Sequence, residues 1–149
     1  MKSPTSSLPE ADWQWLTDRA TELIDRYHEL DSELGTGFVH GDAYSGNTLW
    51  GPDGILLGDW DEASSAPLEL DLANTYQGAR FGETETELDA FADAYGWDIR
   101  TWDGFAILRD MRDLHTLGSY IRRSATDRAA AAELRLRVRT LRDPAAADM

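Results

Sequence analysis

The sequence predicts an α+β fold that is mostly helical, on two observations. Over most of its 149 residues, apolar side chains recur three and four positions apart, which is the spacing of one face of a helix. Between residues 37 and 57 that spacing gives way to short extended segments, separated by turns that contain glycine. One helix, a small hairpin and then several helices make up a single mixed domain, which we expect to span residues 1–149.

The first helix is expected over residues 10–34, where apolar residues mark one continuous face. Ser7 can accept hydrogen bonds from the first turn, and Pro9 is tolerated there because its missing N–H is not needed. Gly35 and Gly37 follow the last apolar position. Because glycine weakens a helix, we expect these two residues to end it.

Three short extended segments follow, at Gly37–Val39, Thr48–Trp50 and Ile55–Leu57. The second and third are separated by Gly51-Pro52-Asp53-Gly54, a run of the residue types that form tight turns. Extended segments joined by so short a turn pair with each other. We therefore expect a β-hairpin from Thr48 to Leu57.

The rest of the chain is expected to form four helices: residues 67–80, residues 84–95, a helix that starts near Thr101, and residues 126–141. Pro67 opens the first of them and Gly96 closes the second, which are positions that these residue types favour. The apolar residues from Phe105 to Ile121 lie on one side of the third helix. This run of helices supports the mostly helical class.

The formal net charge of −14 is concentrated before residue 106, where 22 acidic and 5 basic residues leave −17. Residues 106–149 hold 6 acidic and 9 basic residues, or +3. A surface this acidic repels nucleic acid and anionic membranes and attracts cationic ligands. The same charge also keeps a protein in solution without any role in recognition, so a cationic substrate is one of two interpretations.

Composition also bears on the compartment. The chain has no cysteine, which excludes disulfides and thiolate metal sites. Its first residues lack the apolar stretch of a secretory signal, and no apolar run approaches the roughly 20 residues that span a bilayer. We therefore expect a cytoplasmic protein that binds neither nucleic acid nor a membrane.

The chemistry is concentrated between Phe38 and Asp71. Asp42 and Asn47 lie on one polar loop that follows an extended segment, and Asp59 follows the hairpin. Because a hairpin returns the chain to its starting edge, Asp59 should lie near Asn47. Two carboxylates and an amide oxygen make an all-oxygen site suited to Mg²⁺, which favours phosphate oxygens as its other ligands. The pattern predicts phosphoryl transfer or phosphate hydrolysis.

The spacing is that of kinase-type enzymes, in which His-x-Asp is followed by an asparagine five residues after the aspartate and by a metal-binding aspartate after a hairpin. The stretch resembles the aminoglycoside phosphotransferase family of kinase-like enzymes. The matching residues, in order, are His40-Gly41-Asp42, Asn47, Asp59-Trp60-Asp61 and Asp71-Leu72-Ala73.

The resemblance implies a role for each matching position. Asp42 would accept a proton from the substrate hydroxyl or orient it, and Asn47 and Asp59 would hold Mg²⁺ on the phosphates of ATP or GTP. Three further positions have supporting roles: His40 packs beneath the loop, Asp71 braces the loop from the following helix, and Asp61 lines the substrate side. Taken alone, Asp42 also suits an Asx-turn and Asp71 a first-turn helix acid.

The resemblance also implies that a nucleotide-binding lobe is missing. Such enzymes carry a β-sheet lobe and a phosphate-binding lysine before the catalytic loop, whereas here about forty residues precede it and the only lysine is Lys2. The chain is therefore expected to be a kinase-like C-terminal lobe, whose hairpin carries the catalytic and metal loops. By itself it should bind nucleotide weakly. It should form a homodimer, cover its exposed interlobe surface with its own N-terminal segment and helix, or pair with a separate N-terminal lobe.

Three functions remain open at this stage. The favoured one is an ATP- or GTP-dependent kinase that phosphorylates a hydroxyl of a small molecule. The second is a non-catalytic binding or interaction domain derived from the same family, which the intact Asp42, Asn47 and Asp59 argue against. The third is a metal-dependent phosphate hydrolase, which lacks a second cluster of metal ligands in the sequence.

Overall fold

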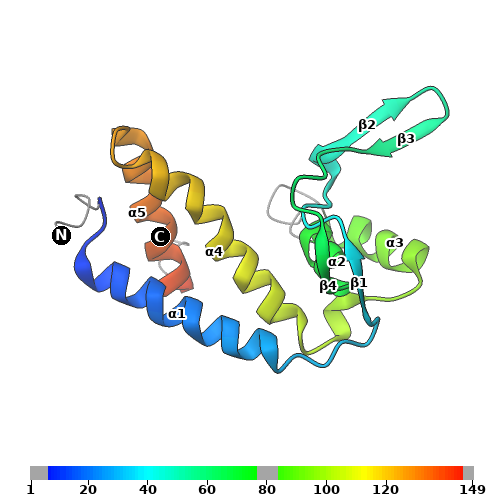
Figure 1. The fold of residues 1–149 in the computed structure, drawn as a ribbon, viewed down its shortest axis with the longest axis horizontal. Helices are drawn as coiled ribbons and strands as arrows, with labels where there is room; N and C mark the ends of the chain where they lie inside the picture. Colours follow the sequence, from blue (N-terminus) through cyan, green and yellow to red (C-terminus); the bar gives the residue numbers. More distant parts are fainter. Residues whose placement is uncertain (1–6, 77–83, 146–149) are drawn as a thin grey trace. The chain divides into compact units, whose positions relative to one another are not determined.

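The computed structural model describes residues 7–76 and 84–145 (Figure 1). Helices dominate these residues, and the strands form two small antiparallel sheets, so the mostly helical α+β class is confirmed. The chain divides into two compact units, one built from Met1–His28 with Asp110–Met149 and the other from Glu29–Arg109. The assignment of residues 1–149 as one domain stays a prediction.

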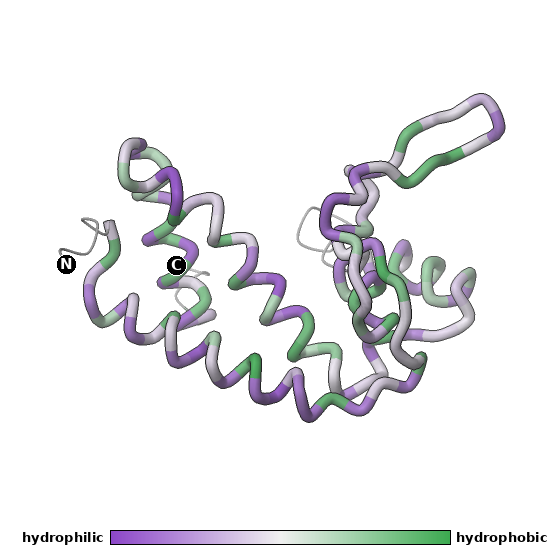
Figure 2. The backbone as a smooth tube through the Cα atoms, in the orientation of Figure 1, coloured by the Kyte–Doolittle hydropathy of each residue, from purple (hydrophilic) through white to green (hydrophobic). Residues whose placement is uncertain are grey.

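The first unit is helical. It contains α1 (Glu10–His28), the greater part of α4 (Phe105–Arg123) and α5 (Arg128–Arg142). In Figure 2 these helices alternate between apolar and polar residues along their length, as amphipathic helices do. Their apolar faces meet in a buried cluster of Leu8, Leu16, Leu117, Leu134 and Val138. Each such side chain contributes about 1.5–3 kcal/mol when fully buried.

Helix α1 differs from the prediction at both ends. The Pro9 carbonyl accepts the N–H of Asp12 at 3.0 Å and that of Trp13 at 3.1 Å, so the helix begins after Pro9. Ser7 does not cap it, because its buried Oγ has no hydrogen-bond partner among the described residues. The helix then ends at His28, six residues before the predicted end.

The early end of α1 has a long-range cause. Glu69 is fully buried, and its carboxylate accepts hydrogen bonds from the Ser32 hydroxyl at 2.8 Å and the backbone N–H groups of Glu33 and Leu34 at 2.7 and 2.9 Å. A helix through these residues would commit both N–H groups to carbonyls four positions earlier. The carboxylate satisfies them instead, and the segment leads directly into the first strand.

The second unit contains both sheets. Strand β1 (Thr36–Val39) pairs antiparallel with β4 (Ser64–Pro67), and β2 (Thr48–Gly51) pairs antiparallel with β3 (Gly54–Leu57). The predicted hairpin is therefore confirmed. Strand β4 was not predicted, and Pro67, which was expected to open a helix, instead ends this strand. Pro67 is tolerated there because β4 is an edge strand.

The β2–β3 hairpin exposes apolar side chains on both of its faces. Directly paired residues share a face, so Leu49 and Leu56 lie on one side and Trp50 and Ile55 on the other. Their exposed fractions are 62%, 57%, 85% and 63% in that order. An antiparallel ribbon ordinarily keeps one polar face for water. Neither face of this hairpin is covered within the described chain.

Helix α2 (Glu69–Tyr76) follows β4, and the predicted end of this helix at Arg80 lies outside the described residues. Helix α3 (Glu85–Tyr95) confirms the prediction at both ends, with Thr84 in a capping box and Gly96 in the left-handed conformation at φ 91°. A 3-10 turn, η3 (Ile99–Thr101), precedes α4, which starts at Phe105 instead of near Thr101.

Within residues 7–76 and 84–145, no helix combines the length and the apolar character that crossing a membrane requires.

Candidate active site

The loop that follows β1 is held by one face of helix α2. The Asp71 carboxylate accepts the backbone N–H of His40 at 2.8 Å through Oδ2 and that of Gly41 at 2.9 Å through Oδ1. Charge-assisted hydrogen bonds of this kind are stronger than neutral ones. Asp71 therefore fixes two consecutive amide groups immediately before Asp42.

Two further residues of α2 act on the same loop. Asn74 Nδ2 donates to the Gly41 carbonyl at 2.8 Å, and Thr75 Oγ1 donates to the Ala43 carbonyl at 3.0 Å. Residues three and four positions after Asp71 share its face of the helix. Neither residue was predicted from the sequence. The available signal was this spacing, which places two polar side chains on the same face of the helix as Asp71.

Gly41 brings the loop against the segment that contains Asp59. Its φ is +88°, which lies in the left-handed region that glycine adopts freely. A Cβ atom added here would lie 2.3 Å from the backbone oxygen of Glu62. The glycine thus allows two loops to approach at backbone distance.

His40 links the same two segments from beneath. Its side chain is only 2% exposed, Nδ1 accepts the N–H of Asp42 at 3.1 Å, and Nε2 lies 2.7 Å from the Gly58 carbonyl. Because Nδ1 is the acceptor, the proton is assigned to Nε2, which donates to Gly58. The ring packs edge-on against Trp60, with 4.5 Å between ring centroids. All of its polar atoms are engaged with the protein.

Asn47 connects Asp42 to the end of the hairpin. Its Nδ2 donates to the Asp42 carbonyl at 2.9 Å and to Asp42 Oδ2 at 3.1 Å. Its own backbone carbonyl accepts the N–H of Gly58 at 2.8 Å. Asp42, Asn47 and the residue that precedes Asp59 therefore belong to one hydrogen-bonded network.

Asp59 has a backbone conformation that is rare for its type. Its φ is 56°, and among the described residues it alone combines a side chain with a positive φ. The flanking residues hold it there: Gly58 is bonded on both sides, and Trp60 Nε1 donates to the Leu57 carbonyl at 2.8 Å. Such outliers concentrate at functional sites. The side chain of Asp59 is exposed, and so is that of Asp61 in the turn that follows.

The Phosphotransferase enzyme family, APH, matches residues 4–108 of this chain. The chain belongs to this family. Among curated proteins, none matches the chain significantly in sequence.

Two of the solved structures that match the chain contain a region with its fold. One is the amicoumacin kinase hAmiN in complex with AMP-PNP, Ca²⁺ and Ami, with a TM-score of 0.73, 18% identity and coverage of 92% of this chain and 46% of that one. The other is a choline/ethanolamine kinase family protein from Mesorhizobium loti, with a TM-score of 0.66, 17% identity and coverage of 95% and 50%. The chain thus spans about half the length of each of these proteins.

The donor atoms near Asp42 bear on whether the chain can hold a metal ion. No three His, Cys, Asp or Glu side chains in the described ranges are grouped closely enough to bind a metal alone. Asn47 uses Nδ2 toward Asp42, which leaves Oδ1 outside those bonds. The Asp59 carboxylate makes no hydrogen bond or ion pair within residues 7–76 and 84–145. An amide oxygen and a carboxylate suit Mg²⁺ that takes its other ligands from phosphates and water.

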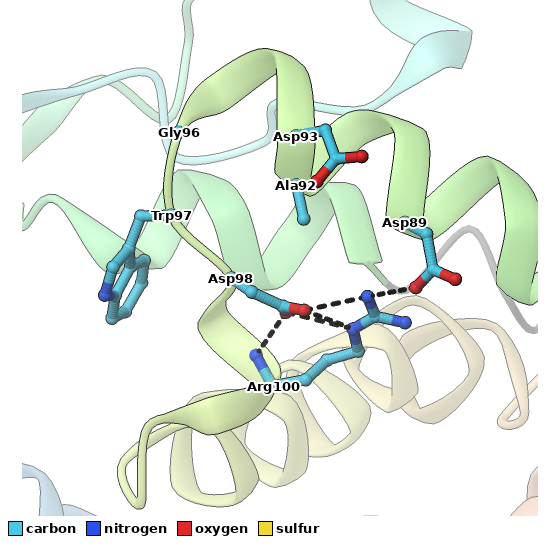
Figure 3. A pocket seen from close by; sticks show the side chains of 7 residues that line it. All are labelled: Asp89, Ala92, Asp93, Gly96, Trp97, Asp98 and Arg100. Carbon is cyan, nitrogen blue, oxygen red and sulfur yellow. Dashed lines mark hydrogen bonds and ion pairs between the residues drawn. The ribbon is translucent and has the colours of Figure 1, made fainter.

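A separate groove of about 560 Å³ lies beside α3 in the second unit (Figure 3). Its lining residues are Asp89, Ala92, Asp93, Gly96, Trp97, Asp98 and Arg100. The Arg100 guanidinium bonds to Asp89 at 2.6 Å and to Asp98 at 2.8 Å, and this pairing lowers the pKa of the Asp98 carboxyl. None of the predicted site residues lines this groove. Because the groove shares no lining residue with the predicted site, it is a second feature of the unit.

Proposed function

We propose that this chain is the catalytic lobe of a kinase that transfers the terminal phosphoryl group of ATP or GTP to a hydroxyl of a small molecule. One observation carries the proposal. The hydrogen-bonded network of Asp42, Asn47 and Gly58 joins the two loops that phosphoryl transfer requires, and it lies in a chain of the phosphotransferase family. Phosphoryl transfer depends mainly on positioning and electrostatic stabilisation, which such a network supplies.

In this proposal Asp42 acts on the substrate. Its carboxylate orients the attacking hydroxyl and accepts its proton, and Asn47 steadies that carboxylate through Oδ2. Asn47 Oδ1 and the Asp59 carboxylate would hold Mg²⁺. When bound, the ion would neutralise charge on the nucleotide phosphates. Asp71 and His40 support the loop, and Asp61 faces the substrate side.

The other half of the nucleotide clamp is proposed to come from outside the described fold. The related structures are about twice as long as this chain, and both faces of the β2–β3 hairpin are apolar and uncovered. Exposed apolar patches of this kind mark interaction surfaces. A separate N-terminal lobe or a second copy of the chain would cover the hairpin, and sedimentation of the purified chain distinguishes self-association from a monomer.

The substrate is proposed to be cationic, and the enzyme cytoplasmic. Residues 29–109 carry 17 acidic and 3 basic residues, a balance of −14, whereas the remaining residues carry 11 of each and are neutral. The whole net charge therefore belongs to the unit that holds the site. Such a field raises the local concentration of cations. A panel of acceptors in which neutral or anionic compounds are preferred would contradict this assignment.

The metal assignment can be tested site by site even where binding is weak. Mn²⁺ with ATP or GTP, titrated into ¹⁵N-labelled chain, should broaden the amide signals of Asn47 and Asp59 by paramagnetic relaxation. Asp59→Ala should remove this broadening. Asp53→Asn, which deletes an exposed acid in the hairpin turn, should leave it unchanged. Equal broadening in wild type and Asp59→Ala would show that the metal binds elsewhere.

Turnover tests the role of Asp42. The isolated chain should bind Mg·ATP and Mg·GTP weakly in calorimetry and release little phosphate, because losing even about 4 kcal/mol of transition-state stabilisation slows a reaction roughly a thousandfold. Whatever turnover it has should fall by orders of magnitude in Asp42→Ala, with nucleotide affinity little changed. Micromolar affinity and substantial Asp42-dependent turnover would show that no second lobe is needed.

A further inference from the structure

The peptide group between Gly41 and Asp42 is held from both of its sides. Asn74 Nδ2 donates to the Gly41 carbonyl at 2.8 Å, and the Asp42 N–H donates to His40 Nδ1 at 3.1 Å. The carbonyl and the N–H belong to the same planar peptide group. Rotating this group about the chain would break both hydrogen bonds together, so the two bonds define one orientation.

The backbone alone does not define that orientation. This peptide group rotates about ψ of Gly41 and φ of Asp42, and glycine has no Cβ atom to restrict its backbone torsions. The next peptide group is held separately, because the Asp42 carbonyl accepts from Asn47 Nδ2 at 2.9 Å. Asn74 therefore supplies, together with His40, a constraint on the N-terminal side of Asp42, and it does so from outside the loop.

The surroundings of Asn74 determine which of its two amide atoms, Nδ2 or Oδ1, faces Gly41. The side chain is 3% exposed, and the atom that faces it is a carbonyl oxygen, which accepts only from an N–H. The Asn74 Oδ1 atom is buried without a hydrogen-bond partner among the described residues. A buried amide oxygen in that state is unfavourable, and an apolar side chain of similar size would avoid it. The useful atom of Asn74 is thus its donor.

We propose that Asn74 is a positioning residue that aims the Asp42 carboxylate by fixing the Gly41–Asp42 peptide group. The inference rests on the proposed function for its effect on turnover, but not for its effect on the loop. Among the described residues, Asn74 hydrogen-bonds to the Gly41 carbonyl and not to Asn47 or Asp59, the proposed metal ligands. It should therefore affect kcat and leave the KM for nucleotide unchanged.

The effect on the loop is measurable by NMR on the isolated ¹⁵N-labelled chain, without turnover. In wild type, the His40 ring should show the ¹⁵N shifts of a single Nε2–H tautomer, and the Asp42 amide should exchange slowly with solvent. Asn74→Ala should speed exchange at Asp42 by about tenfold, the effect of one lost hydrogen bond, and should mix the His40 tautomers. Thr140→Val, which removes a hydroxyl-to-carbonyl bond within α5, should change neither signal.

Unchanged Asp42 exchange and His40 shifts in a folded Asn74→Ala chain would overturn the proposal. If Asn74→Ala does not fold, the wild-type side-chain NH₂ of Asn74 decides the question. Slow exchange of its protons supports the hydrogen bond to Gly41, and free exchange refutes it.

Enzyme kinetics provide a separate test, made with the chain alone or with its complex with a nucleotide-binding lobe. Asn74→Ala should lower kcat at least tenfold at constant KM for nucleotide. An unchanged kcat alongside altered NMR signals would limit Asn74 to a structural role and overturn the positioning proposal. If the wild type shows no Asp42-dependent turnover in either form, the proposed function fails, and the NMR arm still decides whether Asn74 holds the loop.

Discussion

Replacing Gly41 by alanine tests whether the two loops of the site need to touch. The substitution introduces two separate costs. One is the left-handed backbone at φ +88°, and the other is the contact of a new Cβ with the Glu62 carbonyl oxygen at 2.3 Å. The oxygen is part of the backbone, so it cannot rotate away as a side chain would. The loop from Asp59 to Glu62 must therefore move as a whole.

A matched control separates the two costs. Gly96 has almost the same backbone conformation, at φ +91°, and an added Cβ there meets nothing within 4 Å. A left-handed non-glycine residue costs about 1–2 kcal/mol at either position. Overpacking adds about 1–3 kcal/mol at Gly41 alone. With about 2–4 °C per kcal/mol for a chain of this size, Gly96→Ala should lower the melting temperature by about 2–8 °C and Gly41→Ala by about 4–20 °C.

The assay is thermal unfolding of wild type, Gly41→Ala and Gly96→Ala, followed by circular dichroism, with amide NMR spectra of the same three proteins. Gly41→Ala should in addition shift the signals of Asp42 and Asp59 together, because the clash separates their loops. Gly96→Ala should leave both signals in place. Equal melting temperatures for the two variants would refute the argument, since they would show that the Glu62 carbonyl moves without cost.

Two further predictions concern the surroundings of the site. Glu69→Gln should lower the free energy of unfolding by about 1–3 kcal/mol in denaturant titrations, because the buried carboxylate that accepts from Ser32, Glu33 and Leu34 loses an acceptor oxygen. The control is Glu133→Gln, in a half-exposed ion pair, which should change the free energy of unfolding by less than about 0.5 kcal/mol. Asp98 has a pKa lowered by its hydrogen bond to Arg100, so its contribution to stability is present above its unfolded pKa of about 3.9 and is lost as the pH falls through the folded value. The melting temperature of Asp98→Asn should therefore lie below that of wild type at pH 7, with the gap closing below about pH 4; an equal gap at pH 3 and pH 7 would contradict the assignment.

The elements that could be predicted from the sequence are those with local causes. The hairpin was predicted from a four-residue turn between two apolar segments. Its two strands pair in the register that places this turn at the tip of the hairpin. The end of helix α3 followed from Gly96, and in the structure the caps at Thr84 and Gly96 depend on backbone atoms within four residues. In both cases the interactions that define the element lie within the segment itself.

The elements that were missed have partners far along the chain. Residues 29–34 continue the apolar spacing of α1, yet Glu69 takes up their N–H groups from 35 and 36 positions away. Strand β4 has almost no strand character of its own and exists because β1 pairs with it from Thr36 to Val39. Periodicity carries no information about either partner, so it overestimates the length of the helix and does not indicate the strand.

The candidate site shows the same difference between what could and could not be predicted from the sequence. The proposed roles of Asp42, Asn47 and Asp59 rest on their order and spacing, because binding a metal and a phosphate would demand particular side chains. The contacts that Asn74 and Thr75 make could not be predicted. These two side chains donate to backbone carbonyls of the loop, and every residue in any loop offers the same group, whereas the bracing role of Asp71 was expected from the family resemblance alone. A supporting residue that binds backbone leaves no complementary side chain in the sequence, so its role becomes visible only when the helix is placed beside the loop.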